Sequence, residues 1–384
     1  MAGKRGQNEG TIYKRKDGRW EGAITIPNSE GKRKRFYGET AKEVREQLTA
    51  FLRALDQGEP ISLNRQTVGQ FLEKWLTETA RPKIRPSTYV SYQSKVANYL
   101  IPALGKHQLT KLTPQQVQTM MNEMSERGLS PRSVQYARAV LRKALNQAMK
   151  WGLVVRNVAT LSEPPRVVRP EMKILHPEQA RQFLDTVRGD RLAAFYAVAL
   201  SLGLRQGEAL GLRWQDVDLD GGTLHVRVAL QWLSGHAPTL VEPKTRQSRR
   251  SLALPPALVA QLKAHRTRQK EERLLAGQRW QGEEWGLVFP NTLGGPLSKF
   301  TLHGQFKRHL HNAGLPDVRF HDLRHSCASL LLAQGIHPRV VMEILGHSTI
   351  ALTMNVYSHV LPQTQRDALH ALSDGLFAVA ATGT

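Results

Sequence analysis

The sequence predicts a mainly α-helical chain with small β-sheets, an α+β protein, and three observations support this. Residues 1–62 contain short stretches of alternating apolar and polar side chains, followed by one helical pattern. Residues 63–165 repeat helix-start signals, and residues 166–384 are mostly helical with two strand-like stretches. A chain of 384 residues, 40% of them hydrophobic, can bury more than one core. We therefore expect three domains, at 1–62, 63–165 and 166–384.

The charge balance indicates a polyanionic partner. The chain has 54 Lys and Arg against 32 Asp and Glu, a net charge of +22, which favours nucleic acid over an anionic membrane surface. No apolar run is long enough to span a membrane, and the first ten residues lack the apolar stretch of a signal peptide. We therefore expect a cytoplasmic, nucleoid-associated protein with no membrane partner. The single cysteine, Cys327, excludes disulfides within the chain and a multi-cysteine zinc site.

The first domain is expected to be a three-stranded sheet covered by one helix. Strand-like stretches at 10–15, 19–26 and 32–37 are separated by two turn signals, Asp17-Gly18 and residues 28–31. Thr40 is placed to cap a helix that Gly58 ends. The opposite sheet face would bind DNA, although a solvated basic surface is the alternative. The side chains expected on that face are Lys14, Arg15, Lys16, Trp20, Arg33, Lys34, Arg35 and Tyr37.

The second domain is expected to be a bundle of four or five helices with a basic side. Pro or a hydroxyl side chain stands at nearly every predicted helix start, as at Thr67, Pro86, Thr113 and Ser130. No acidic residue occurs from Thr79 to Asn122. The candidate DNA-binding side chains are Lys83, Arg85, Lys95, Arg132, Arg138 and Arg142. A proline-rich stretch at 162–170 is typical of an extended linker.

Two segments of the last domain place a cation at a defined position. An apolar helix ends at Gly203, and Arg205 then stands at the start of the next helix, where its guanidinium and free backbone amides can face one anion. Glu208, one helical turn further on, can hold that guanidinium, although such a pair is often only a surface ion pair. Lys244 is expected in the turn between strands at 223–230 and 248–254, where simple solvation is the ordinary alternative.

Two further segments add histidines, an arginine and a tyrosine. His321 and Arg324 share one face of a predicted helix, while His325 is expected to point inward and to bond the backbone. Gly346 ends the following helix and so fixes where His347 emerges. Tyr357 lies ten residues after His347, downstream of all these cations.

Together these side chains are suited to phosphoryl transfer without a metal. Arginines can offset the charge on the non-bridging phosphate oxygens, as Mg²⁺ does in other enzymes. A tyrosine hydroxyl, with a free pKa of about 10, needs a neighbouring base and cations to attack. The sequence contains no Walker loop, no dinucleotide-binding glycine motif and no acidic cluster of the metal-nuclease kind. We therefore expect neither a cofactor nor a metal.

In this order and at these separations the segments resemble the signature of tyrosine recombinases, the phage integrase family. The matching motifs are Arg205-x-Gly-Glu208, a hairpin Lys244, His321-x-Leu-Arg324-His325, Gly346-His347 and Tyr357-Ser-His359. The resemblance extends to an arm-binding domain at 1–62 and a SAM-like core-binding domain at 63–165. It implies that Tyr357 attacks the DNA phosphate to form a 3′-phosphotyrosyl bond, and that Lys244 protonates the leaving 5′-oxygen. It also implies that Arg205 and Arg324 hold the phosphate, that His321 and His347 assist, and that Glu208 supports the site.

The function implied is site-specific integration and excision of a phage or mobile element. The implied partners are double-stranded DNA with core and arm att sites, three further copies of the chain in a tetramer, and a directionality factor or DNA-bending protein. Two alternatives remain open: a chromosome-dimer or plasmid resolvase with the same chemistry, and a non-catalytic DNA-binding regulator on the same scaffold. Resolvases of this kind usually lack the first 60 residues, and intact catalytic motifs argue against the regulator.

Overall fold

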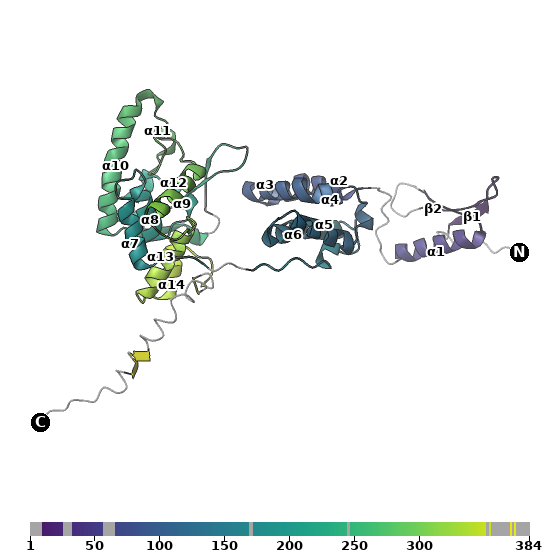
Figure 1. Ribbon diagram of the computed structural model, residues 1–384. Coiled ribbons are helices and arrows are strands. Elements are labelled where there is room, and N and C mark those ends of the chain that lie inside the picture. The colour runs from purple at the N-terminus through teal and green to yellow at the C-terminus, as the bar shows by residue number, and fades with distance from the viewer. Residues whose placement is uncertain are drawn as a thin grey trace. The chain divides into compact units, whose positions relative to one another are not determined.

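The computed structural model forms two compact units, Met1–Arg169 and Pro170–Thr384 (Figure 1). It describes residues 10–25, 33–56, 66–168, 172–243 and 246–350, together with 353–354, 369–370 and 372–373. The predicted α+β class is confirmed, since helices dominate both units and the sheets are small. The turn at 28–31 and the helix end at Gly58 lie outside the described residues.

A three-stranded antiparallel sheet and one helix form the start of the first unit. The strands β1 (Thr11–Lys14), β2 (Trp20–Thr25) and β3 (Arg33–Gly38) pair in sequence order. Asp17-Gly18 makes the first turn, where Gly18 takes φ +85°. The helix α1 (Ala41–Asp56) begins after Thr40, whose hydroxyl accepts a hydrogen bond from the Glu43 amide at 3.2 Å. The predicted strands, hairpin and cap are therefore confirmed.

The strand register divides the basic residues of the sheet between its two faces. Phe36 packs against Phe51 of α1, and a Cβ at Gly22, opposite Phe36, would lie 2.6 Å from Val44, so these positions face the helix. Side chains alternate between faces along a strand. Lys14, Trp20 and Lys34 therefore share the helix side, and the expectation that they lie on the open face was wrong.

The open face of the sheet carries Arg15, Arg33, Arg35 and Tyr37 around a buried carboxylate. Glu21 is only 3% exposed and forms ion pairs with Arg15 (3.3 Å) and Arg35 (3.5 Å). Arg15 also lies over the Tyr37 ring, 5.5 Å from its centroid. Two of the arginines are thus held in place by Glu21, whereas Arg33 is exposed at the start of β3. Lys16 lies in the turn rather than on either face.

The rest of the first unit is a helical bundle with the predicted helix starts. The hydroxyls of Thr67, Thr113 and Ser130 each accept a hydrogen bond from a backbone amide three residues on. Apolar side chains from all four helical stretches form one core, which includes Phe71, Leu100, Met120 and Leu141. The bundle's α-helices are α2 (Val68–Lys74), α3 (Pro86–Lys95), α4 (Ile101–Leu104), α5 (Pro114–Glu126) and α6 (Pro131–Lys150), with π-helical turns at Trp75–Ala80 and Val96–Leu100.

The first residues of the proline-rich stretch at 162–170 pack against the bundle. Gln118 exchanges hydrogen bonds with the backbone of Glu163, and the Gln135 side chain donates to the Pro165 carbonyl at 2.9 Å. No helix or strand occurs from 161 to 168, as expected of extended chain. These contacts hold the first residues of the predicted linker against α5 and α6.

The second unit surrounds a large apolar core with helices and places two small sheets at its side. Its helices are α7 (Pro177–Thr186), α8 (Ala193–Leu202), α9 (Gln206–Leu210), α10 (Pro256–Ala276), α11 (Gly282–Trp285), α12 (Lys299–Asn312), α13 (Asp322–Ala333) and α14 (Pro338–Leu345). One sheet has the order β4 (Val217–Asp218), β5 (Thr223–Val226), β8 (Arg250–Ala253), and the other pairs β6 (Ala229–Gln231) with β7 (Thr239–Val241).

The strands expected around Lys244 required a correction. The stretch 223–230 was expected to be one strand paired with 248–254, but it divides into β5 and the start of β6. Only β5 pairs with β8, while β6 pairs with the unpredicted β7. In the sequence, Lys244 therefore comes after β7 and not in a turn that directly joins the two expected strands. Lys244 itself lies outside the described residues.

The helix α8 is the central element of this core. Eight of its ten residues are buried, and Gly203 ends it in the left-handed conformation with φ +59°. A Cβ at Gly203 would lie 2.2 Å from the side chain of Leu345 and 3.2 Å from the sulfur of Cys327. The ends of α8 and α14 and the middle of α13 therefore meet at a point that leaves no room for a side chain.

Substitution of Gly203 by alanine should destabilise the second unit. The left-handed backbone and the contact with Leu345 both penalise a Cβ, and we expect a loss of about 2 kcal/mol or more. Gly314→Ala is the matched control, because Gly314 has φ +62° with nothing within 4 Å of its Cβ position. Thermal unfolding of the whole chain should show a lower melting temperature for Gly203→Ala than for Gly314→Ala. Equal melting temperatures would contradict the close packing described for Gly203.

Candidate active site

Arg205 lies at the start of α9, where the sequence predicted it, and its guanidinium is held on two sides. Its Nη1 donates to Oε1 of Glu208 at 2.7 Å, and its Nη2 donates to the Gly346 carbonyl at 3.0 Å. The Arg205 amide donates to the other Glu208 oxygen at 3.1 Å. Glu208 is 4% exposed, so this is a buried carboxylate and not the surface ion pair that was the alternative. Arg205 itself keeps 37% of its side chain exposed.

Arg324 lies on α13 and is buried beside Arg205. Only 2% of the residue is exposed, and its Nη1 donates to the Gly203 carbonyl at 2.7 Å. Its Nη2 is buried without a hydrogen-bond partner among the described residues. Burial, with the nearby positive charge of Arg205, lowers the pKa of Arg324 to about 9. A buried cation with an unpaired N–H is a strong attractor for an anion.

His321 and His325 lie at the start of α13, one turn apart. Their rings meet edge to face, with centroids 5.1 Å apart. Burial, then the charges of His325 and Arg324, lower the pKa of His321 to about 4, although part of its side chain remains exposed. His325 is half-buried, and its ring packs on His321 without a backbone hydrogen bond among the described residues. The expected hydrogen bond from His325 to the backbone is thus not found within the described part of the chain.

His347 emerges directly after α14, as predicted from Gly346. Gly346 takes φ +64° and the His347 amide bonds back to the Met342 carbonyl at 3.0 Å. His347 is 7% exposed, and its Nδ1 lies 2.9 Å from the Thr353 hydroxyl. Burial and the charges of Arg324 and Arg205 lower the pKa of His347 to about 3. His347 is therefore neutral at physiological pH.

Two of the six predicted catalytic residues, Lys244 and Tyr357, lie outside the described residues. Both remain predictions from the sequence. The segments that precede them are placed, because β7 ends at Val241 and Thr353 bonds the His347 ring. The structure thus brings together Arg205, Arg324, His321 and His347, with Glu208 behind Arg205.

One residue of this cluster was missed by the sequence analysis. Arg250, the first residue of β8, is 7% exposed in its side chain and donates to Oε2 of Glu208 at 3.0 Å. It was one of several basic residues after Lys244, and nothing in the local sequence separates it from Arg249. The interaction spans 42 residues along the chain and could not be read from local spacing.

The candidate DNA-binding residues of the bundle have different environments. Arg138 donates to the Ser162 hydroxyl at 3.1 Å and to the Thr160 carbonyl at 3.3 Å, so it fastens α6 to the following segment. Lys95 lies over the Tyr99 ring at 4.9 Å. Lys83, Arg85, Arg132 and Arg142 are exposed. Their contacts with DNA remain predictions from the sequence.

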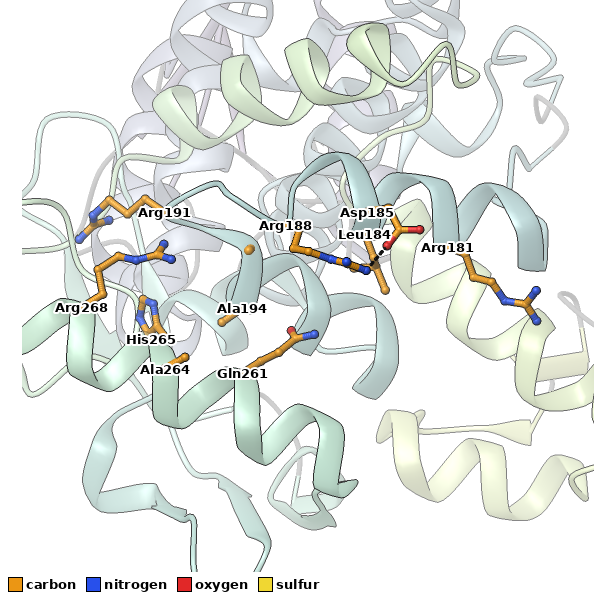
Figure 2. A pocket seen from close by; sticks show the side chains of 11 residues that line it. Arg181, Leu184, Asp185, Arg188, Arg191, Ala194, Gln261, Ala264, His265 and Arg268 are labelled. Carbon is orange, nitrogen blue, oxygen red and sulfur yellow. Dashed lines mark hydrogen bonds and ion pairs between the residues drawn. The ribbon is translucent and has the colours of Figure 1, made fainter.

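A pocket of about 420 Å³ lies between α7 and α10 (Figure 2). Three of the four arginines that line it already have acceptors. Arg188 bonds Asp185 at 2.6 Å, and Arg191 forms two hydrogen bonds with Glu272. Arg268 donates to the Asp190 carbonyl at 2.9 Å. None of Arg205, His321, Arg324 and His347 lines this pocket, so we do not place the active site there.

No group of three or more His, Cys, Asp or Glu side chains in the described part of the chain is arranged to hold a metal ion. No helix among the described residues has the length and apolar character required to cross a membrane.

Comparisons with known proteins agree with the geometry. Residues 173–364 match the model of the phage integrase family, and residues 67–125 match that of the phage integrase N-terminal SAM-like domain. A tyrosine recombinase XerC-like protein of Caldanaerobacter subterraneus subsp. tengcongensis is 31% identical over 370 residues, covering 91% of this chain and 95% of its own. An integrase of Streptomyces ambofaciens is 31% identical over 398 residues, covering 98% of each chain.

Solved structures show the same fold. The Tn1549 transposon integrase in complex with a circular intermediate DNA superposes with a TM-score of 0.67 at 21% identity, covering 80% of this chain and 99% of that one. A lambda integrase tetramer bound to a Holliday junction gives a TM-score of 0.57 at 20% identity, covering 88% of this chain and 95% of that one.

The lowered pKa of His347 predicts that acid destabilises the protein. An unfolded histidine takes up a proton near pH 6.5, whereas folded His347 does so only near pH 3, so stability is lost as pH falls below about 6.5. Between pH 7 and 5.5 this one buried residue should account for about 1 kcal/mol. Urea unfolding of His347→Asn at both pH values should show that much less pH dependence than wild type.

The control for this prediction is His311→Asn, which changes an exposed histidine at the end of α12. Its stability difference between pH 7 and 5.5 should match that of wild type. A His347→Asn variant with the full wild-type pH dependence would show that His347 is not held in its neutral form.

Proposed function

We propose that this chain, which belongs to the phage integrase family of tyrosine recombinases, cuts and rejoins DNA through a covalent bond between Tyr357 and a 3′-phosphate. The observation that carries the proposal is the buried Arg324 guanidinium, which has an unpaired N–H beside a fixed Arg205. The positive charge of Arg205 disfavours the charged form of Arg324, and an anion bound by both side chains would offset that repulsion. A DNA phosphate is the anion that fits the family and the overall charge of +22.

Arg205 and Arg324 stabilise the negative charge that develops on the phosphate during attack. Arg205 is fixed by Glu208 and the Gly346 carbonyl, so little reorganisation is needed when the phosphate binds. Donors that are oriented before the reaction, in a site with little water, lower the barrier most effectively. The two arginines thereby provide the positive charge that Mg²⁺ provides in other phosphoryl-transfer enzymes.

His321 and His347 act as neutral groups, because their pKa values are lowered to about 4 and about 3. When the Thr353 hydroxyl donates to Nδ1 of His347, the ring proton is on Nε2 and can be donated to a phosphate oxygen. Neutral His321 can accept the proton of the Tyr357 hydroxyl. The role of His321 as a proton acceptor requires an uncharged ring, which burial and the neighbouring positive charges favour.

The covalent step exchanges one phosphate ester for another. The Tyr357 oxygen forms a bond to phosphorus while the bond to the 5′-oxygen breaks, and Lys244 gives its proton to that leaving oxygen. The phosphotyrosyl ester conserves the energy of the broken bond, so a 5′-hydroxyl from a second duplex can displace Tyr357 without ATP. Strand exchange is then the same reaction in reverse.

The larger arrangement follows from three proposed domains. Residues 1–62 bind arm sites, residues 63–165 hold the core site, and residues 166–384 cut it in the cytoplasm, on the nucleoid. Four copies would act together on two att sites; a lambda integrase tetramer has been seen bound to a Holliday junction. A directionality factor or DNA-bending protein would select integration or excision. The sheet-plus-helix module favours an integrase over a chromosome-dimer or plasmid resolvase.

Replacement of Tyr357 by phenylalanine should abolish the covalent adduct. The protein would be incubated with nicked core-site DNA and the adduct measured on denaturing gels, with the labelled peptide identified by mass spectrometry. We expect the rate of adduct formation to fall at least 1,000-fold for Tyr357→Phe, because the nucleophilic oxygen is removed. A loss on the order of 1,000-fold or more is typical when an enzyme's nucleophile is deleted. Tyr196→Phe is the control, since the buried Tyr196 hydroxyl has no partner among the described residues. An adduct with Tyr357→Phe would refute the assignment of the nucleophile.

The two faces of the N-terminal sheet should differ in DNA binding. Arg33 lies on the open face and Lys34 on the helix side, although they are adjacent. For Arg33→Ala we expect about fivefold weaker binding to DNA of the element ends. The slope of the logarithm of the binding constant against the logarithm of the salt concentration should be smaller in magnitude by about 1. Lys34→Ala should change neither quantity by as much. If Lys34→Ala weakened binding more than Arg33→Ala, the open face would not be the DNA-binding face.

A further inference from the structure

Arg250 connects three elements of the active site through one buried side chain. It is the first residue of β8, the strand that follows the segment with Lys244. Its Nη2 donates to Glu208 at 3.0 Å, its Nε donates to the Ile344 carbonyl at 2.6 Å, and its Nη1 donates to the Ser248 carbonyl at 3.1 Å. Each of its three nitrogens therefore has an acceptor within the protein, which leaves Arg250 directed at the scaffold and not at DNA.

The acceptors of Arg250 are the groups that fix the phosphate-binding residues. Oε2 of Glu208 is shared between Arg250 and the backbone amide of Arg205, while Oε1 binds the Arg205 guanidinium. Ile344 lies in the last turn of α14, two residues before the Gly346 carbonyl that accepts from Arg205. The approach is close, because a Cβ at Gly346 would lie 3.0 Å from Nη1 of Arg250.

We infer that Arg250 is a positioning residue, whose guanidinium holds Glu208 and the end of α14 so that Arg205 and His347 face one phosphate. The planar fork of arginine is required, since a lysine ammonium in the same place cannot span the Glu208 carboxylate and the Ile344 carbonyl in the same geometry. The inference deepens the proposed function and rests on it. It assigns a role to a residue that does not touch the reacting atoms.

The positive charge of Arg250 also stabilises the ionised form of the Glu208 carboxylate. Burial alone would raise the pKa of Glu208, but Arg250 and Arg205 lower it. Without Arg250, Glu208 keeps one cation where it had two, and its ionised form becomes less favourable. Proton uptake by Glu208 would then weaken its hold on Arg205. Loss of Arg250 should thus move the acid limb of the cleavage rate to higher pH.

The test compares Arg250→Lys with Arg249→Lys in the full chain. Both substitutions keep the charge, but Arg249 is about half exposed and pairs with Glu242 at the surface. Single-turnover adduct formation on nicked core-site DNA would be measured at saturating protein, together with the dissociation constant for the same DNA. For Arg250→Lys we expect a rate at least tenfold lower and a dissociation constant within threefold of wild type. Arg249→Lys should match wild type in both.

A double-mutant cycle with Glu208→Gln identifies the route of the effect. If Arg250 acts through Glu208, the double variant should be no slower than the slower single variant. If Arg250→Lys melts below the assay temperature, Glu208→Gln alone tests whether the Arg250–Glu208 contact matters for cleavage. An unchanged cleavage rate for Glu208→Gln would overturn the inference. A rate for Arg250→Lys equal to that of Arg249→Lys, or losses that multiply in the double variant, also overturns it. Absence of any adduct with wild type would instead refute the proposed function itself.

Discussion

The buried carboxylate of Glu208 is the group on which the arrangement of the active site depends. It lies between Arg205 and Arg250, with contacts of 2.7–3.1 Å to both, and almost no solvent reaches it. A buried ion pair gives little net stability, but removing one partner typically costs about 3–5 kcal/mol because a charge is left uncompensated. This cluster therefore contributes mainly by fixing the positions of the elements it connects, and less by stabilising the fold. It joins the start of α9, the start of β8 and the end of α14, and each of these elements leads to a candidate catalytic residue.

Burial, together with this concentration of positive charge, explains the state of the histidines. Burial is the main cause that lowers the pKa of Arg324 and of Arg250, and the charge of Arg205 lowers both further. Burial and the neighbouring positive charges both lower the pKa of His321 and of His347, so an imidazolium is unfavourable at either position. One phosphate would change the balance, because a negative charge between the arginines reduces their repulsion. The site is thus stable with neutral histidines and most complementary to an anion at its centre.

Local sequence signals predicted the positions of single residues, whereas tertiary contacts decided their partners. Gly203, Gly346 and Thr40 were predicted correctly because helix ends and caps depend on a few neighbouring residues. Arg250 was missed because its acceptors lie 42 and 94 residues away.

The strands were harder to predict than the helix ends. Three residues, Lys14, Trp20 and Lys34, were assigned to the wrong sheet face because the prediction did not take the alternation of side chains along a strand into account. The strands β4 and β7, of two and three residues, are too short to leave a hydrophobic pattern. Lys244 and Tyr357 remain assignments by motif alone.

The central claim is that Arg205, Arg324 and His347 form one phosphate-binding site that exists before DNA binds. It is tested most directly by the structure of the full chain, as the Tyr357→Phe variant, on a core-site duplex. We expect Nη2 of Arg324 and the exposed edge of the Arg205 guanidinium within hydrogen-bond distance of the same phosphate, with the Glu208–Arg250 contact unchanged. A phosphate bound away from both arginines, or a Glu208–Arg250 pair that separates on binding, would contradict the account.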